Sequence, residues 1–213
     1  MTDKRQFIDF LVQQNVLKFG RFTLNSGRIS PYFFNLGSVA SGGAYAELGS
    51  AYAKAVLQSG AEFDLLFGPA YKGIPIAVAT AMALAERGVD VGVAYNRKEA
   101  KDHGEGGLLV GAPVSGRVLM LDDVLTSGKA IRGAANLIRS EGAEIAGVVI
   151  AMDRAEVMAG SDDTAVSDLR SELAAPVISI AHVSDVLAYL NQKPSQSEAL
   201  NAMQAYVDQH CAL

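Results

Sequence analysis

The spacing of apolar residues separates a short first segment from the rest of the chain. Over residues 1–40 it predicts a helix at 3–14 and two short strands at 19–24 and 31–36. A second helix follows at 43–58, where apolar residues recur three or four positions apart and Gly60 ends the run. We expect residues 1–40 to form a small hood over one edge of the core.

Beyond residue 60, short apolar strands alternate with helices. The expected strands are 64–68, 91–95, 118–121, 145–152 and 177–180, and the expected helices are 73–87, 128–141, 182–191 and 197–209. Strands without polar alternation are buried on both faces, as in a parallel sheet, and helices between them imply right-handed crossovers. The pattern predicts one α/β domain over 1–213, with its core at 41–213 and a mostly parallel sheet flanked by helices.

Composition narrows the classes of function. Half of the residues are hydrophobic and 19% are charged, as in ordinary globular proteins. A single cysteine, Cys211, excludes an internal disulfide and a cysteine-based metal cluster. The net charge of −5 argues against general nucleic-acid binding, although a local basic cluster can still hold an anionic small ligand. Without a membrane-length apolar run or an apolar signal core, we expect a cytoplasmic protein.

Four predicted strands end in polar or charged residues. These are Tyr71 and Lys72 after 64–68, Asn96 to Lys98 after 91–95, Asp122 and Asp123 after 118–121, and Asp153 and Arg154 after 145–152. In open parallel sheets, ligands bind beyond the carboxyl ends of the strands. Any one of these ends could be a solvated strand terminus, but the four together predict a ligand cleft with acidic and basic walls.

The stretch VLMLDDVLTSGKA, residues 118–130, carries the most specific pattern. Small residues and a glycine at a helix start expose backbone N–H groups, which together with the helix dipole suit a phosphate. The carboxylates of Asp122 and Asp123 can accept hydrogen bonds from a neighbouring diol. A ligand that combines a phosphate with a diol one sugar away is a ribose 5-phosphate.

The alternative interpretation is an ordinary helix start, with Thr126 or Ser127 as N-cap and a solvated pair of aspartates before it. Two other phosphate motifs are excluded. The run from Gly68 to Gly73 continues with Ile-Pro, unlike a P-loop, and no G-x-G-x-x-G follows the first parallel strand.

Residues 97–107 form a dense run of charge followed by glycines, RKEAKDHGEGG. Charge at this density cannot lie in the core, and closely spaced glycines allow large backbone movement. We predict a mobile loop that closes a basic lid over an anionic ligand; a solvated hairpin is the alternative.

These motifs resemble the type I phosphoribosyltransferases, whose phosphoribosyl pyrophosphate (PRPP) signature is similar to residues 118–129. The segments FGRFTLNSGRISPYFFNL, FGPAYKGIPIAV and NRKEAKDHGEGG are similar to the orotate-specific members and cover most of the chain in the same order. The resemblance implies the type I phosphoribosyltransferase fold. It also implies transfer of the ribose 5-phosphate group of PRPP to orotate, giving orotidine 5′-phosphate and pyrophosphate in UMP biosynthesis.

The resemblance also assigns the residues that bind PRPP. Asp122 and Asp123 hold the ribose hydroxyls, and Tyr71 and Lys72 hold the pyrophosphate, in a loop whose Ala70–Tyr71 peptide is expected to be cis. The phosphate turn supplies Val124, Leu125, Thr126, Ser127, Gly128, Lys129 and Ala130. The lid and its base supply Arg97, Lys98, Lys101 and His103. The expected catalytic residues are Lys101, His103, Lys72, Asp122 and Asp123, with Asp102 as an undecided proton shuttle.

For orotate, the resemblance implies Phe33 and Phe34 beside the ring, Thr126, and Arg154 facing the carboxylate. Adjacent strand residues point to opposite sides, so at most one of the two phenylalanines can stack on the base. An ion pair of Arg154 with Asp153 or Glu156 is the alternative. Mg²⁺ held mainly by PRPP, and a homodimer that shares the lid across its interface, are also implied.

One position departs from the family. Asn25 stands where close relatives carry a lysine that contacts the anionic ligand. Asparagine keeps a donor but loses the charge, so we expect weaker PRPP binding. Two rival functions remain: a phosphoribosyltransferase for another base, which a substrate panel would test, and a PRPP-sensing regulator, which normally carries a DNA-binding extension.

Overall fold

The computed structural model describes the backbone of residues 2–24, 27–101, 107–126, 128–158 and 160–213, and the side chains of these residues except 2, 3, 100 and 101. The helices are α1 (Thr2–Gln13), α2 (Gly42–Ser59), α3 (Gly73–Ala85), α4 (Lys129–Ser140), α5 (Ala165–Leu173), α6 (Val183–Asn191) and α7 (Ser197–His210). The strands are β1 (Leu17–Thr23), β2 (Ile29–Phe34), β3 (Leu65–Gly68), β4 (Gly92–Lys101), β5 (Gly107–Gly111), β6 (Arg117–Val124), β7 (Glu144–Asp153) and β8 (Val177–His182). Short 3₁₀ turns occur at Leu36–Ser38 and Pro194–Gln196.

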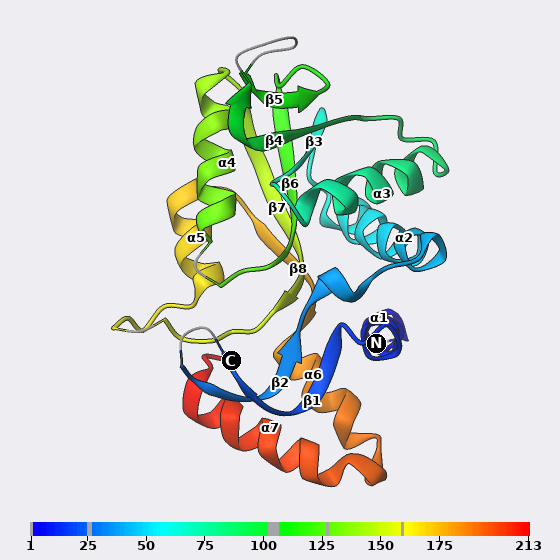
Figure 1. Ribbon diagram of the computed structural model, residues 1–213, viewed down its shortest axis with the longest axis vertical. Coiled ribbons are helices and arrows are strands. Elements are labelled where there is room, and N and C mark those ends of the chain that lie inside the picture. The colour runs from blue at the N-terminus through cyan, green and yellow to red at the C-terminus, as the bar shows by residue number, and fades with distance from the viewer. Residues whose placement is uncertain (1, 25–26, 102–106, 127, 159) are drawn as a thin grey trace.

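Within these ranges, the main sheet has six strands in the order β5-β4-β3-β6-β7-β8 (Figure 1). Every neighbouring pair from β4 to β8 is parallel, and β5 pairs antiparallel to β4 at one edge. The predicted mostly parallel sheet is therefore confirmed, with the addition of β5, a strand that the sequence pattern did not predict.

Alternate residues of the central strands serve two separate cores. Val118 and Met120 of β6 belong to a cluster with α4 and α5, whereas Leu119 and Leu121 belong to a cluster with α2 and α3. All four side chains are fully buried. Burial on both faces explains why β6 reads as a continuous apolar run, and it produces the three-layer arrangement in Figure 1.

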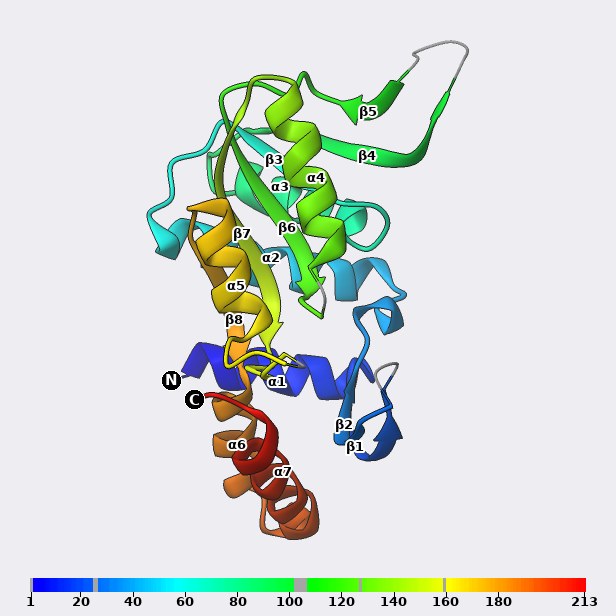
Figure 2. The same cartoon turned by 90° about the vertical axis from the view of Figure 1, so that its left-hand side faces the viewer.

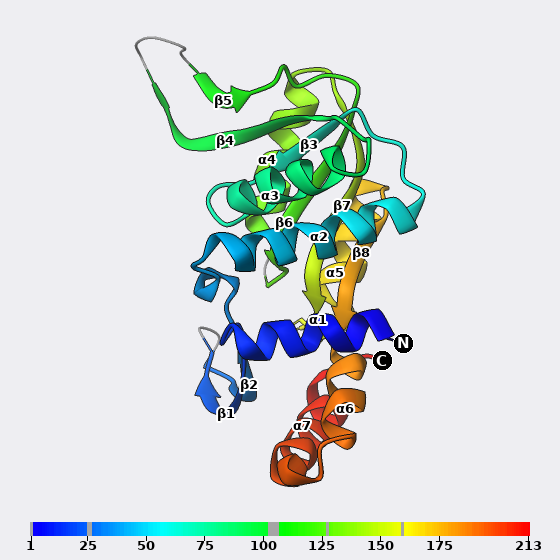
Figure 3. The same cartoon turned by 90° about the vertical axis from the view of Figure 1, so that its right-hand side faces the viewer.

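The hairpin of β1 and β2 forms a second, two-stranded sheet, apart from the main one. Figures 2 and 3 show it beyond the end of the main sheet at which β6 and β7 terminate, with α1 running between the two parts. β2 packs against α7, and α1 packs against α6 and β8. The carboxyl ends of the strands, where a ligand would bind, thus face a second layer built from both ends of the described chain.

Each predicted helix and strand is present. Most bounds shift by one to three residues, but β4 continues to Lys101, six residues beyond its predicted end and into the predicted loop. The sequence pattern missed β5 and α5. Asp122 and Asp123 also lie inside β6, which continues to Val124, rather than after its end. Among the described residues, no helix combines the length and apolar character needed to cross a membrane.

Helices α2 and α3 approach each other closely at Gly49. A Cβ atom added to Gly49 would lie 2.3 Å from the carbonyl oxygen of Ala79, far inside van der Waals contact. The obstructing atom belongs to the backbone, so no rotamer change can relieve the overlap. The glycine is therefore required by the helix contact, even though glycine weakens a helix interior.

We predict that Gly49→Ala destabilises the protein by about 2 kcal/mol or more, because the two helices must separate. The control is Gly133→Ala in α4, where an added Cβ meets no atom within 4 Å. This control should stabilise the protein by roughly 0.5–1 kcal/mol, through the helix propensity of alanine. Denaturant unfolding of both variants measures the difference, and equal effects would contradict the assignment.

Candidate active site

A pocket of about 650 Å³ opens where β3 and β6 lead into their helices. Its described lining residues come from the β3–α3 turn, β4, the end of β6, the β6–α4 turn and the start of α4. They are Ala70, Tyr71, Lys72, Lys98, Asp122, Asp123, Val124, Leu125, Thr126, Gly128, Lys129, Ala130 and Ile131. Three of the four polar strand ends singled out in the sequence therefore meet in one pocket.

The two carboxylates of this pocket are shielded from water. Asp122 is 8% exposed and Asp123 7% exposed. The Asp123 N–H donates to Oδ1 of Asp122 at 2.9 Å, and the Val124 N–H donates to Oδ1 of Asp123 at 2.8 Å. Lys72 Nζ forms an ion pair with Oδ2 of Asp123 at 2.7 Å. From the core side, the Tyr52 hydroxyl donates to the backbone carbonyl of Asp122 at 2.6 Å.

This environment favours the protonated form of Asp122. Burial, followed by the nearby charge of Asp123, raises the pKa of Asp122 to about 7. The Asp123 N–H and the Lys72 ammonium oppose this increase in the pKa only in part. A cation or a set of hydroxyl donors beside Asp122 would favour its charged form.

The phosphate turn after β6 has the geometry of an anion site. Gly128, with a φ of +64°, is the N-cap of α4 and has no side chain with which to cap the helix. Thr126 is thus not the N-cap, so this part of the alternative interpretation is wrong; Ser127 lies outside the described residues. Lys129 and Ala130, the first residues of α4, line the pocket, and the N–H groups at the start of a helix bind anions well.

Helix α5 braces this turn. Arg132 of α4 forms ion pairs with Asp168 and Glu172 of α5. Its guanidinium lies so close to the turn that a Cβ added to Gly128 would be 2.8 Å from Nη1. A side chain at position 128 would displace the Arg132 guanidinium and would also have to adopt a left-handed φ.

The β3–α3 loop contributes Lys72 to the pocket, and β4 contributes Lys98. The Ala70–Tyr71 peptide of this loop is cis, which confirms the expectation from the sequence. The Ala70 N–H donates to Oδ1 of Asn96 at 3.1 Å, which ties this loop to β4. Tyr71 is 62% exposed, and Lys98 Nζ lies 4.9 Å from the centre of its ring.

The predicted lid is described only at its two ends. β4 extends to Lys101, which pairs with Gly107 of β5, so the described flanks form the hairpin that was the alternative to a free loop. Arg97 Nη1 donates to the Gly107 carbonyl at 3.3 Å. His103, Asp102 and the Lys101 side chain lie outside the described residues, and so does Asn25.

Of the residues expected to hold orotate, Thr126 lines this pocket, whereas Phe33, Phe34 and Arg154 are not among its described lining residues. Phe33 is 38% exposed and its ring packs 5.5 Å from that of Phe22, whereas Phe34 is 6% exposed and belongs to the core. Phe33 alone therefore remains available for stacking, since Phe34 anchors β2 instead. Arg154 is buried and ion-paired with Glu156, which was the alternative interpretation of this arginine.

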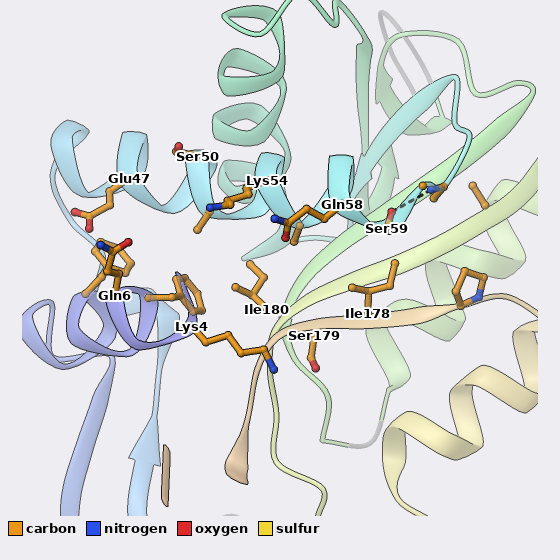
Figure 4. Close-up of a pocket in the computed structure, with 18 residues that line it drawn as sticks. Lys4, Gln6, Glu47, Ser50, Lys54, Gln58, Ser59, Ile178, Ser179 and Ile180 are labelled. Carbon is orange, nitrogen blue, oxygen red and sulfur yellow. Dashed lines mark hydrogen bonds between the residues drawn. The ribbon is translucent and has the colours of Figure 1, made fainter. Parts of the chain in front are cut away.

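A second hollow of about 620 Å³ lies between α1, α2 and β8 (Figure 4). Ile178 and Ile180 of β8 point toward α2, with Lys4 of α1 and Lys54 of α2 nearby. Lys4 is paired with Asp185 at 2.9 Å. Its described lining residues include no pair of neighbouring acids beside the start of a helix. The β6–α4 turn has both features, so we place the candidate active site there.

Several polar residues of the site escaped the sequence analysis. Asn96 was noted only as a strand end, and Tyr52 only as part of an apolar helical face. Glu156 was considered only as a possible partner of Arg154. Their roles depend on contacts with distant segments, for which a single sequence carries no local signal.

The chain was compared with known proteins. The phosphoribosyl transferase domain family matches residues 38–172. An orotate phosphoribosyltransferase of Pectobacterium carotovorum is 53% identical over 207 residues, which are 97% of each chain. One from Stutzerimonas stutzeri is 52% identical over 209 residues, also 97% of each chain. The crystal structure of the Francisella tularensis orotate phosphoribosyltransferase superposes with a TM-score of 0.88 at 36% identity, covering 97% of this chain and 100% of that one.

The elevated pKa of Asp122 predicts a pH-dependent cost in stability. Because the folded pKa of about 7 lies above the ordinary carboxyl pKa of 3.8, ionising Asp122 lowers the free energy of unfolding as the pH rises through this window. Asp122→Asn removes the charge, so it should stabilise the protein at pH 8 by about 1 kcal/mol or more. The gain should shrink toward pH 4.

Thermal or denaturant unfolding at pH 5 and pH 8 measures this effect. Asp90→Asn is the control because Asp90 is exposed; its effect on stability should not change over this range. A gain from Asp122→Asn that is equal at both pH values, or absent at both, would contradict the prediction.

Proposed function

The chain belongs to the orotate phosphoribosyltransferases, and on that premise we propose how its own residues carry out the transfer. The enzyme transfers the ribose 5-phosphate group of PRPP to orotate, giving orotidine 5′-phosphate and pyrophosphate. The observation that carries the proposed site is the buried Asp122–Asp123 pair directly before the open start of α4.

In this proposal the ribose hydroxyls of PRPP donate to the carboxylates of Asp122 and Asp123. The 5-phosphate accepts from the backbone N–H groups of the turn at Thr126 to Ala130, where the helix dipole favours negative charge. Both contacts form within one pocket. A phosphorylated pentose satisfies the two groups at once, which neither a free phosphate nor a free sugar can do.

The pyrophosphate lies against the β3–α3 loop. Breaking the bond from C1 of the ribose to pyrophosphate leaves positive charge on the sugar and negative charge on the leaving group. Lys72, Lys98 and the lid residues Arg97, Lys101 and His103 stabilise that negative charge. Lys72 is held by its ion pair with Asp123, so it is already aligned before the ligand arrives.

A divalent cation fits this site. Two buried carboxylates share one close ammonium group, so a Mg²⁺ ion beside them would offset the remaining negative charge. Among the described residues, no group of three or more His, Cys, Asp or Glu could hold a metal alone. We propose that Mg²⁺ would be held mainly by PRPP, beside Asp122 and Asp123, and would supply charge stabilisation to the leaving pyrophosphate.

Orotate would lie between Phe33, Thr126 and Arg154. Phe33 provides an exposed ring face, and the Arg154 guanidinium suits the orotate carboxylate. The ring nitrogen of orotate then attacks C1 of the ribose. No protein nucleophile is needed in this scheme, and Asp102 remains a candidate for moving the proton.

A cytoplasmic location also remains a prediction.

We propose that the enzyme is a homodimer whose lid reaches the partner's site. Helix α3, which follows the pyrophosphate loop, exposes Val78 and Met82 on one face, at 42% and 65%. With the exposed Tyr71 nearby, this face offers apolar area for a second copy of the chain. The β4–β5 hairpin extends away from the core of its own subunit in Figures 2 and 3.

The activity is tested by pyrophosphate release from PRPP in the presence of orotate and Mg²⁺, with uracil and adenine as comparison bases. Lys101→Ala should lower kcat by roughly 100-fold while the KM for PRPP changes by less than about 3-fold, because the lid acts mainly in the closed state. Losses of similar size in kcat and in PRPP binding would argue against this role.

Lid sharing is tested by mixing two inactive variants, Lys101→Ala and Asp123→Asn. A mixed dimer has one site that combines the intact lid of one subunit with the intact acid pair of the other. Random exchange should therefore restore about a quarter of wild-type activity. Activity that stays at the level of the separate variants, although the subunits exchange, would show that each lid serves its own site.

A further inference from the structure

Arg154 is held in place from several directions. It is 8% exposed, its Nε donates to Oε1 of Glu156 at 2.9 Å, and its guanidinium carbon lies 4.4 Å from the ring centre of Tyr32. A buried guanidinium requires a counter-charge and hydrogen-bond partners. Glu156 supplies both, so the orientation of Arg154 depends on what fixes Glu156.

Glu156 receives donors from two other parts of the chain. The Tyr206 hydroxyl of α7 donates to the same Oε1 atom at 2.7 Å, and Tyr206 is itself 5% exposed. Arg28, just before β2, approaches Oε2 at 3.7 Å. The carboxylate is thus fixed by α7 and by the hairpin, and it in turn orients the Arg154 guanidinium.

The segment after α7 fixes the backbone around Glu156. The Ala212 N–H donates to the Ala155 carbonyl and the Val157 N–H to the His210 carbonyl, each at 2.9 Å. The Cys211 thiol approaches the Arg154 carbonyl at 3.4 Å. These contacts hold Ala155 at a φ of +50°, a conformation that alanine rarely adopts without such support.

We propose that Glu156 and Tyr206 are positioning residues for the base site, which orient Arg154 toward the carboxylate of orotate. The inference rests on the role proposed above for Arg154. A free arginine must give up considerable rotamer freedom when it binds a ligand. Here Glu156, fixed by Tyr206, restricts the rotamers of Arg154 before orotate binds. Helix α7, which carries Tyr206, therefore influences the affinity for orotate.

The test uses a single substitution at each of the two positioning residues. Tyr206→Phe removes one hydrogen bond to Glu156 and keeps the buried ring. The KM for orotate should rise about 3- to 10-fold, in line with one hydrogen bond to a charged group. The KM for PRPP and kcat should stay within about 2-fold, because the phosphate turn is untouched. Glu156→Gln should raise the orotate KM further, by about 10-fold or more, since it also removes the counter-charge of Arg154.

Tyr189→Phe is the matched control. Tyr189 is also buried, and its hydroxyl also donates to a carboxylate, that of Asp9, at 2.8 Å, but between α6 and α1. It should leave the orotate KM unchanged. If Tyr206→Phe and Tyr189→Phe alter the orotate KM equally, the effect is one of general stability and the inference is wrong.

Arg154→Ala distinguishes the role of Arg154 in the base site from the positioning role of Glu156 and Tyr206. A raised orotate KM in Arg154→Ala with no change in Tyr206→Phe and Glu156→Gln would refute the positioning role but keep Arg154 in the base site. An unchanged orotate KM in Arg154→Ala would remove Arg154 from the base site, and the positioning role with it. A rise in all three variants, selective for orotate, supports both.

Discussion

Two neighbouring carboxylates with almost no contact with water are the constraint on which this structure depends. Like charges at adjacent positions repel, and burial increases that repulsion because water no longer screens it. Asp122 and Asp123 are tolerated because backbone N–H groups and Lys72 offset part of the charge. The remaining negative charge can be offset by a cation or by hydroxyl donors of a ligand.

The sequence was sufficient for the parts of the molecule that are determined locally. Strands buried on both faces were visible as apolar runs, and three of the four polar strand ends expected to meet line one pocket, whereas Asp153 and Arg154 are not among its described lining residues. The orientation of Phe33 and Phe34 followed from the alternation of a strand alone. In each case the signal lies within a few residues of the feature it predicts.

The features that escaped prediction depend on distant partners or on weak patterns. β5 (Gly107–Gly111) begins and ends in glycine and is partly exposed, so it reads as loop until β4 pairs with it. Helix α5 is short and largely polar, although the capping box at Thr164 and Ser167 was present in the sequence. The contact between Glu156 and Tyr206 joins residues 50 positions apart, and such a contact produces no periodic pattern in the sequence.

The close approach of α2 and α3 has a consequence for the evolution of this enzyme. Helix α2 carries Gly49 at the contact with Ala79 and, one turn later, Tyr52 beneath the carbonyl of Asp122. Any side chain at position 49 would force α2 and α3 apart, and α2 also carries the Tyr52 hydroxyl that supports the acid pair. Because the obstacle is a main-chain atom, a substitution at position 79 would not remove it. A compensating mutation would have to shift a whole helix, so the effect of a change at position 49 would depend strongly on the rest of the sequence.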